Sequence, residues 1–198
     1  EFEKQFKLME ELILEARNNI DDIERNKKIN QIVNYANEYN TGFNEIVDYQ
    51  DRRNTLVLDV LTNKGSEMES NLSELIKLLF EEGHDDLLYR AGEAQRHFLL
   101  ARLHVGKYLE DNKQGFADTV INEFSQMDKW LKLLDEEVSN ERTRELLNLT
   151  INDRQIYETD FEELTSVIKN RNIIIDRLNE LGLKISSTAE EIKSSIDF

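Results

Sequence analysis

Two arginines lie on the apolar faces of predicted helices, where a charged side chain needs a partner. At about 100° of rotation per residue, Arg102 lies about 40° from Phe98, the centre of one apolar stripe. The same count places Arg154 about 20° from Phe161 on a second helix. A buried guanidinium group is costly unless an anion pairs with it, and its planar shape suits a carboxylate. The spacing therefore predicts a site for a small organic acid between Arg102 and Arg154.

Residues at the same depth on neighbouring helices complete the predicted pocket. Gly65 has no side chain and would leave room for a ligand. In the alternative, which stays open, the two arginines form internal ion pairs with Glu69 or Glu123, or extend outward to solvent. The predicted ligand-binding residues are Arg102, Arg154, Tyr157, Gln95, Gly65, Met68, Ser125 and Asn122.

Two Arg-Asn dipeptides form a second group of candidates. Arg53 and Asn54 recur as Arg171 and Asn172, with each asparagine nearer the middle of the apolar stripe than its arginine. If the two dipeptides lie at the same height on antiparallel helices, they would meet at a junction between modules or line a second pocket. The alternative is that a buried asparagine pair only fixes the helix register.

The histidines do not support a metal site. Glu81-x-x-His84 has the spacing found in di-iron helical bundles, but such a site needs two of these motifs and two further glutamates. His97 and His104 are predicted to point about 100° away from the apolar face of their helix. No metal ligand is therefore predicted.

The sequence also lacks the motifs of common enzymes. It contains no cysteine, which excludes disulfides, CxxC metal sites and thiol nucleophiles. It has no Gly-rich phosphate-binding loop and no plausible Ser-His-Asp set. We therefore predict no catalytic residue, no cofactor and no enzymatic activity.

Composition sets the fold class and excludes some partners. The 198 residues include 41 acidic and 25 basic side chains, so the net charge is −16 and broad nucleic-acid binding is not expected. Proline is absent and there are only seven glycines, which disfavours a loop-rich or β-rich fold. No apolar run reaches the length of a membrane span, so membrane attachment would be only through flanking segments. An all-α fold is predicted.

Small polar clusters divide the chain into five predicted helices. Gly83-His84-Asp85 reads as a helix end followed by a new N-cap, and residues 111–115 read as a turn. Ser139-Asn140 reads as another cap. The predicted helices cover residues 1–20, 22–82, 85–111, 115–138 and 140–197.

An internal repeat explains why two of these helices are so long. The pattern from Tyr39 to Glu45, Y-x-T-x-F-x-E, recurs from Tyr157 to Glu163 after a shift of 157 − 39 = 118 positions. Phe6 coincides with Phe124 in the same shift. The repeat predicts two stacked antiparallel four-helix bundles that share the two long helices. The expected modules are residues 1–53 with 170–198 and residues 54–169, and the first would lack one upstream helix.

The chain resembles a known family over essentially its whole length. The features that carry the resemblance are the segment Ala101-Arg-Leu-His-Val-Gly-Lys-Tyr-Leu109, the polar turn after it, and Tyr157, Phe161 and Arg171 on the last long helix. These features are similar to the helical bimodular ligand-binding domain of bacterial chemoreceptors, also found in related sensor histidine kinases. The chain departs from the family in lacking its first helix, which supplies arginines to a membrane-proximal pocket.

The resemblance implies a function and a location. Members of the family sense small organic acids or similar metabolites on the periplasmic or extracellular face of the cell membrane. They lie between two transmembrane helices, usually as homodimers, and pass a helix shift across the membrane. The expected partners are thus a small organic acid and a second copy of the chain. Two alternatives stay open, a spectrin-like helical scaffold and a kinase sensor that recognises a peptide or a binding protein.

Overall fold

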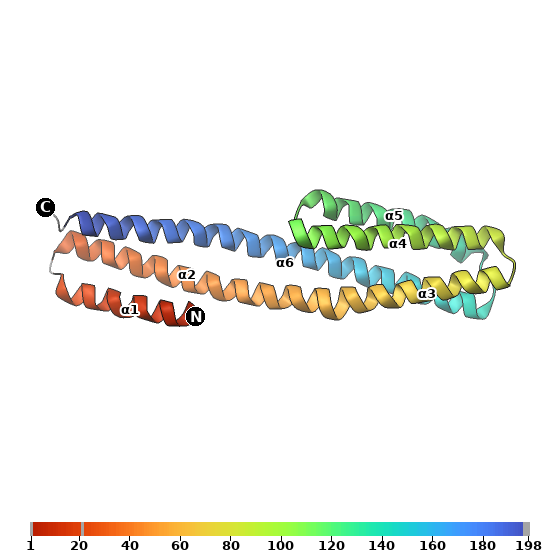
Figure 1. Cartoon of the computed structure of the whole chain (residues 1–198), viewed down its shortest axis with the longest axis horizontal. Coiled ribbons are helices and arrows are strands. Elements are labelled where there is room, and N and C mark those ends of the chain that lie inside the picture. Colours follow the sequence, from red (N-terminus) through yellow and green to blue (C-terminus); the bar gives the residue numbers. More distant parts are fainter. Residues whose placement is uncertain (1, 21, 196–198) are drawn as a thin grey trace. The chain divides into compact units, whose positions relative to one another are not determined.

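The computed structural model describes residues 2–20 and 22–195. Predicted helix ends at residues 1, 196 and 197 lie outside these residues. The described part of the chain is helical and contains no strand, so the predicted all-α fold is confirmed. The elements in chain order are α1 (Phe2–Asn19), α2 (Ile23–Thr55), the π-helical segment η1 (Leu56–Leu61), α3 (Thr62–Glu81), α4 (Asp85–Asp111), α5 (Gln114–Glu137) and α6 (Glu141–Ser194) (Figure 1).

Local chemistry sets the helix ends. Gly83 follows α3 with φ of 75°, and Asn112 ends α4 with φ of 54°, both in the left-handed region that stops a helix. Asn140 caps α6, because its Oδ1 accepts a hydrogen bond of 2.8 Å from the backbone N–H of Arg142. Helix α4 spans the predicted residues 85–111.

The prediction of one uninterrupted helix over residues 22–82 is wrong at η1. Leu56 and Leu61 are both buried although they lie five residues apart, and the buried positions that follow, Gly65, Met68 and Leu72, return to steps of four and three. A π-helical turn absorbs the extra residue and keeps the apolar stripe on one face. The Thr62 hydroxyl donates a hydrogen bond of 2.7 Å to the Val57 carbonyl across this segment.

The helix ends follow the internal repeat. Helix α1 ends at Asn19 and α2 begins at Ile23; adding 118 to each number gives 137 and 141. Helix α5 ends at Glu137 and α6 begins at Glu141. The same helix, turn and helix thus occur twice along the chain, with the boundaries in register.

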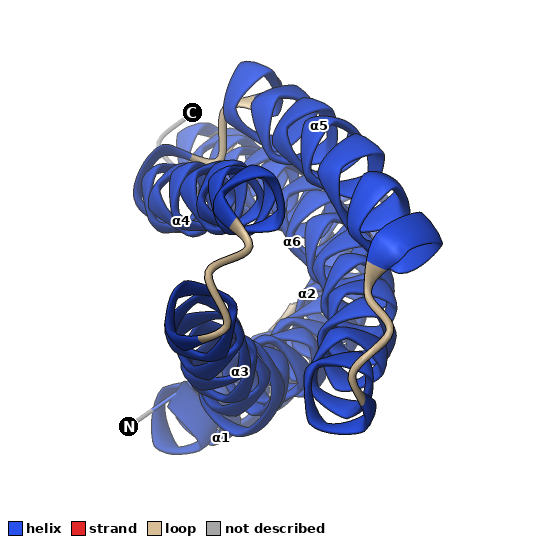
Figure 2. Ribbon diagram, turned by 90° about the vertical axis from the view of Figure 1, so that its right-hand side faces the viewer, coloured by secondary structure: helices blue, strands red, loops and turns tan. Residues whose placement is uncertain are grey.

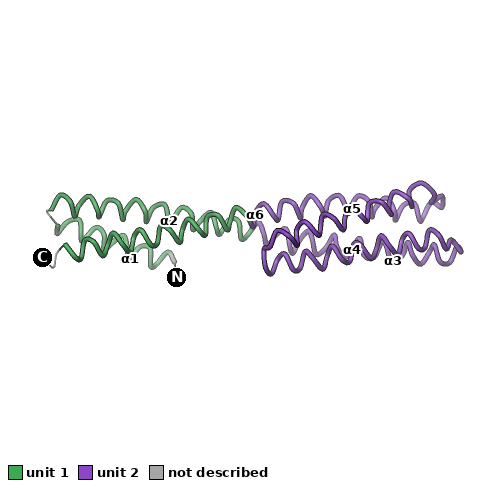
Figure 3. The backbone as a smooth tube through the Cα atoms, turned by 90° about the horizontal axis from the view of Figure 1, so that it is seen from above, with its two compact units in different colours: residues 1–51, 169–198 green, residues 52–168 purple. Residues whose placement is uncertain are grey.

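The chain divides into two compact units (Figure 3). Unit 1 contains residues 1–51 and 169–198, and unit 2 contains residues 52–168. The repeat predicted that the boundaries between the two modules lie after residues 53 and 169. No helix in the described residues is long and apolar enough to cross a membrane.

Unit 2 contains the end of α2, η1, α3, α4, α5 and residues 141–168 of α6, and the last four of these segments form a bundle. Helix α4 packs along both α3 and α5 (Figure 2). Helix α6 is linked to α3 by an ion pair of 3.1 Å between Lys64 Nζ and Asp153 Oδ1, and to α5 through Arg154. Fully buried side chains from all four segments, including Met68, Phe98 and Phe124, fill the interior.

Unit 1 consists, in its described residues, of α1, residues 23–51 of α2 and residues 169–194 of α6. Ile29, Ile32 and Leu178 are buried between these segments. Three cavities of about 230, 280 and 280 Å³ adjoin α1 and are lined mainly by apolar side chains, with Met9 and Ile13 each lining two of them. Apolar side chains of α1 thus leave space against the rest of unit 1.

Candidate functional site

Three aromatic side chains form the centre of the candidate site in unit 2. Phe98 from α4, Phe124 from α5 and Tyr157 from α6 are all buried. The Tyr157 ring lies edge-on to both phenylalanines, with centroid distances of 6.1 Å to Phe98 and 5.6 Å to Phe124. These three residues are referred to below as the aromatic cluster. It occupies the depth at which Arg102 and Arg154 approach the interior.

Arg154 lies against the aromatic cluster with its side chain only 7% exposed. Its Cζ is 5.1 Å from the centre of the Phe124 ring, within the range of a cation–π contact. Nη2 is 2.7 Å from Asp128 Oδ2 on α5, and Nη1 donates a hydrogen bond to Glu158 one turn along α6. Nε is buried and has no hydrogen-bond partner among the described residues. Burial of an unsatisfied donor typically costs about 1–3 kcal/mol.

Arg102 lies on the other side of the cluster and is 30% exposed. Its Cζ is 5.7 Å from the centre of the Phe98 ring, and its Nη1 donates a hydrogen bond to Glu69 on α3. This is the internal ion pair that the sequence left open for Arg102. Glu123, the other partner considered, instead pairs with His97 at 2.6 Å.

Gly65 makes room for protein atoms and not for a ligand, which corrects the prediction. A Cβ atom added to Gly65 would lie 3.2 Å from Arg102 Nε and 3.3 Å from Tyr157 Cε2. The space next to this glycine is therefore filled by the Arg102 guanidinium and by the edge of the Tyr157 ring. Gly65 supports the site by letting these two side chains approach the backbone of α3.

Replacing Gly65 by valine is expected to destabilise the protein by about 1–3 kcal/mol, because Tyr157 is fixed in the aromatic cluster and cannot move aside. Thermal unfolding followed by circular dichroism measures the effect. Gly92→Val is the matched control, since a Cβ atom at Gly92 would have no neighbour within 4 Å. An equal melting temperature for the two variants would show that the space at Gly65 is not tight.

The other predicted pocket residues are distributed differently from expectation. Met68 is fully buried in the core. Gln95 Nε2 donates a hydrogen bond of 3.0 Å to Ser73 Oγ, in an exposed contact between α4 and α3. Asn122 and Ser125 are exposed, so the prediction that they face the interior is wrong. The buried positions of α5 are Val120, Phe124 and Met127, and rotation of about 100° per residue turns Asn122 and Ser125 outward.

Burial has a measurable effect on Tyr157. It raises the pKa of this phenol from 10.0 to about 12, and the neighbouring Arg102 charge lowers that pKa by a smaller amount. The pKa of Tyr157 is higher in the folded state than in the unfolded state. Its contribution to the free energy of unfolding is therefore complete below pH 10 and is lost as the pH rises toward 12.

The free energy of unfolding is therefore expected to fall by about 1.4 kcal/mol per pH unit between pH 10 and 12 through this one group. Urea unfolding at several alkaline pH values measures the slope. In Tyr157→Phe the phenol is gone, while the five other tyrosines remain, so the slope should become shallower. An unchanged slope in this variant would contradict the assigned burial effect.

The histidines of α4 lie between α4 and α5. His97 Nδ1 is 2.6 Å from Glu123 Oε2, and both side chains are largely buried. The His104 ring lies 6.0 Å from the ring of Phe116, and its Nδ1 is buried without a hydrogen-bond partner in the described residues. In those residues, no group of three or more His, Cys, Asp and Glu side chains has the arrangement of a metal site.

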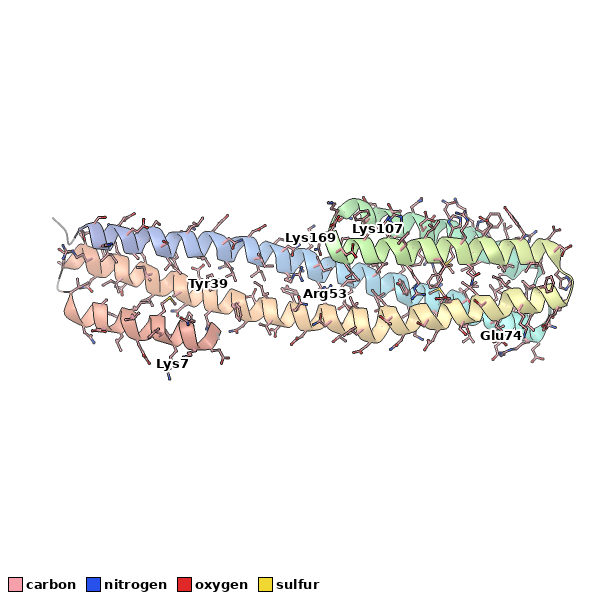
Figure 4. The ribbon with its side chains drawn as sticks, viewed as in Figure 1. Lys7, Tyr39, Arg53, Glu74, Lys107 and Lys169 are labelled. Carbon is pink, nitrogen blue, oxygen red and sulfur yellow. The ribbon has the colours of Figure 1, made fainter. Side chains whose placement is uncertain are left out.

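The two Arg-Asn dipeptides fall in different units. Arg53, on the last turns of α2 (Figure 4), belongs to unit 2 and donates a hydrogen bond of 3.2 Å to Asn54. Arg171 belongs to unit 1, where it donates hydrogen bonds to Asn172 at 3.1 Å and to Gln50 at 2.9 Å. Each arginine thus has partners in its own unit, and a meeting of the two dipeptides stays a prediction.

Unit 1 contains a neutral counterpart of the candidate site. The repeat places Phe6 at the position of Phe124 and Tyr39 at that of Tyr157, and both line the cavity of about 230 Å³. The position of Arg154 is taken by Ala36, which is buried. The guanidinium group at position 154 is therefore a feature of unit 2 that the shared fold does not require.

Searches against protein-family models and against curated proteins gave no match to this chain. The candidate site combines two guanidinium groups, an aromatic cluster and a buried donor that no other described group pairs with. Asp128 and Glu158 also belong to it through their contacts with Arg154, and neither was predicted from the sequence. The Glu158 contact follows a helical spacing of four residues and was detectable from that spacing.

Proposed function

We propose that unit 2 is the ligand-binding part of an extracytoplasmic sensor domain of the chemoreceptor type, and that it binds a small organic anion at Arg154. The observation that carries the proposal is the buried Arg154 guanidinium beside the aromatic cluster, whose Nε finds no partner within residues 2–20 and 22–195. Natural structures rarely leave a buried donor unpaired, and a carboxylate is the anion that best matches a guanidinium edge. The aromatic rings would contact the apolar part of such a ligand.

The signal in this proposal is a small displacement of helices. Asp128 on α5 and Arg154 on α6 are linked directly, so an anion that changes this contact alters the packing of α6. Helix shifts of about 1–2 Å are a common output of such changes. The ligand has to bind one packing better than the other, since equal affinity shifts no equilibrium. In the proposed assembly the domain acts as a homodimer attached to the membrane through flanking segments.

Isothermal titration calorimetry with the sodium salts of acetate, propionate, succinate and adipate tests this function. Saturable binding of at least one of these carboxylates is expected. Absence of binding for all four salts, with the protein folded, would reject the proposal. It would favour the scaffold alternative, with which the internal ion pair of Arg102 and Glu69 is compatible.

A second candidate function rests on unit 1. Its three cavities along α1 are lined mainly by apolar residues, and Leu12 and Leu14 of the same helix are exposed. Such a face suits an amphipathic helix of a peptide or a binding protein. Leu12→Glu and Leu14→Glu would abolish this recognition and leave carboxylate binding in unit 2 intact, which separates the two candidates.

A further inference from the structure

The donors of Arg154 are unequally satisfied. Nη1 donates a hydrogen bond to Glu158, which lies on the same helix and orients the guanidinium from within α6. Nη2 has only the ion pair with Asp128, and Nε has no partner among the described residues. In a guanidinium group, the Nε hydrogen and one Nη2 hydrogen point the same way and form the edge that binds both oxygens of a carboxylate. On this edge of Arg154, Nη2 is paired with Asp128, and Nε has no partner among the described residues.

Asp128 is a weakly held partner on that edge. Its side chain is 50% exposed, whereas the Arg154 side chain is almost completely buried. Partial burial raises the pKa of Asp128 above its ordinary value; the Arg154 charge lowers it and the nearby Glu158 carboxylate raises it again. Two carboxylates therefore share one guanidinium, and the one on α5 can return to solvent by a change of rotamer. Half-exposed ion pairs of this kind contribute little to stability.

We propose that Asp128 occupies the position of the ligand's carboxylate on Arg154 and is displaced when the anion binds. The inference rests on the proposed function and adds to it the group that the ligand must replace. The incoming carboxylate accepts hydrogen bonds from Nε and Nη2 together, so it satisfies the buried donor that Asp128 leaves unpaired. Glu158 stays on Nη1 and keeps the guanidinium in place.

This exchange also explains how binding changes the helix packing. The Asp128 contact joins α5 to α6, whereas the Glu158 contact lies within α6. Replacing the first contact by a ligand removes one link between the two helices and leaves the second unchanged. Anion binding is thereby coupled to loss of the contact between Asp128 and Arg154. The ligand therefore has different affinities for the packing in which this contact is formed and the packing in which it is broken. Asp128 is a positioning residue in this scheme and is not a ligand contact.

Calorimetric titration of Asp128→Asn with sodium propionate at constant ionic strength tests the exchange. Removing the competing charge is expected to tighten propionate binding by about twofold to fivefold, the upper part of the range for loss of a half-exposed ion pair. Glu69→Gln is the matched control, because Glu69 is 48% exposed and pairs with Arg102 as Asp128 pairs with Arg154. It should change the affinity by less than about twofold. Both substitutions are at half-exposed positions, and thermal unfolding checks that both variants fold.

The outcomes distinguish the two proposals. If the wild-type protein binds a carboxylate and Asp128→Asn binds it equally well or more weakly, the exchange at Asp128 is wrong and the proposed function stands. If Glu69→Gln is the variant that binds more tightly, the ligand's carboxylate lies on Arg102 instead, and the inference is overturned. If neither the wild-type protein nor Asp128→Asn binds any of the four carboxylates, the proposed function itself fails and the inference fails with it.

Discussion

Replacing Phe124 by alanine is expected to lower the free energy of unfolding by about 3–5 kcal/mol, the range for truncating a buried phenylalanine. Phe124 is fully buried on α5 and has Tyr157 at 5.6 Å and Arg154 at 5.1 Å from its ring. Its loss would leave a cavity between α5 and α6 and remove the surface on which the guanidinium rests. Urea unfolding monitored by circular dichroism measures the change.

The control for Phe124 is a phenylalanine of the same unit that is not buried. Phe80 on α3 is 70% exposed, so Phe80→Ala should stay within about 0.5 kcal/mol of the wild-type protein. A loss of less than about 1 kcal/mol for Phe124→Ala would contradict a closely packed aromatic cluster at the centre of unit 2.

Replacing Arg154 by alanine is expected to weaken carboxylate binding by about 100-fold, which corresponds to roughly 2.7 kcal/mol. The buried guanidinium is the group on which the proposed ligand forms its charge-assisted hydrogen bonds, and these are stronger than neutral ones. The two carboxylates left behind, Asp128 and Glu158, are partly exposed and can be hydrated, so the protein should remain folded. The repeat supports this tolerance, because Ala36 occupies the equivalent position of unit 1.

Arg142 provides the matched control for Arg154. It also pairs with two carboxylates, Glu74 at 2.9 Å and Glu145 at 2.7 Å, but at a half-exposed position of α6. Arg142→Ala should bind carboxylates with unchanged affinity in calorimetry. If the Arg142 and Arg154 variants lose affinity equally, the effect would come from net charge and not from a site at Arg154.

The fold could be predicted because local signals decide helix ends. The absence of proline, the left-handed positions Gly83 and Asn112 and the cap at Asn140 are all readable from residue type. The segment η1 was not predicted, since a π-helical turn depends on which apolar residues become buried. The five-residue step from Leu56 to Leu61 was visible in the sequence, but the intervening Val57, Leu58 and Val60 offered other registers for the apolar stripe.

The site could be predicted only where helix periodicity decides it. The inward position of Arg154 and the burial of Tyr157 both follow from the 3.6-residue repeat. The ion-pair partners of the two arginines depend on how the neighbouring helices are rotated about their axes. Several carboxylates lie at a suitable depth in the sequence, so the sequence alone does not select the partner. Asn122 and Ser125 were placed by depth along α5, which does not specify the face of the helix. Gly65 was read as room for a ligand because its neighbours Arg102 and Tyr157 could not be located.

The most direct test of the central claim is the NMR resonance of the Arg154 Nε–H group during a titration with sodium propionate, assigned by its disappearance in Arg154→Lys. This donor is buried and has no hydrogen-bond partner in the part of the chain that the structure describes. A saturable shift of this resonance that follows the calorimetric binding curve is expected if the carboxylate engages the Nε and Nη2 edge. An unchanged Arg154 resonance at saturating propionate would contradict an anion site at this guanidinium.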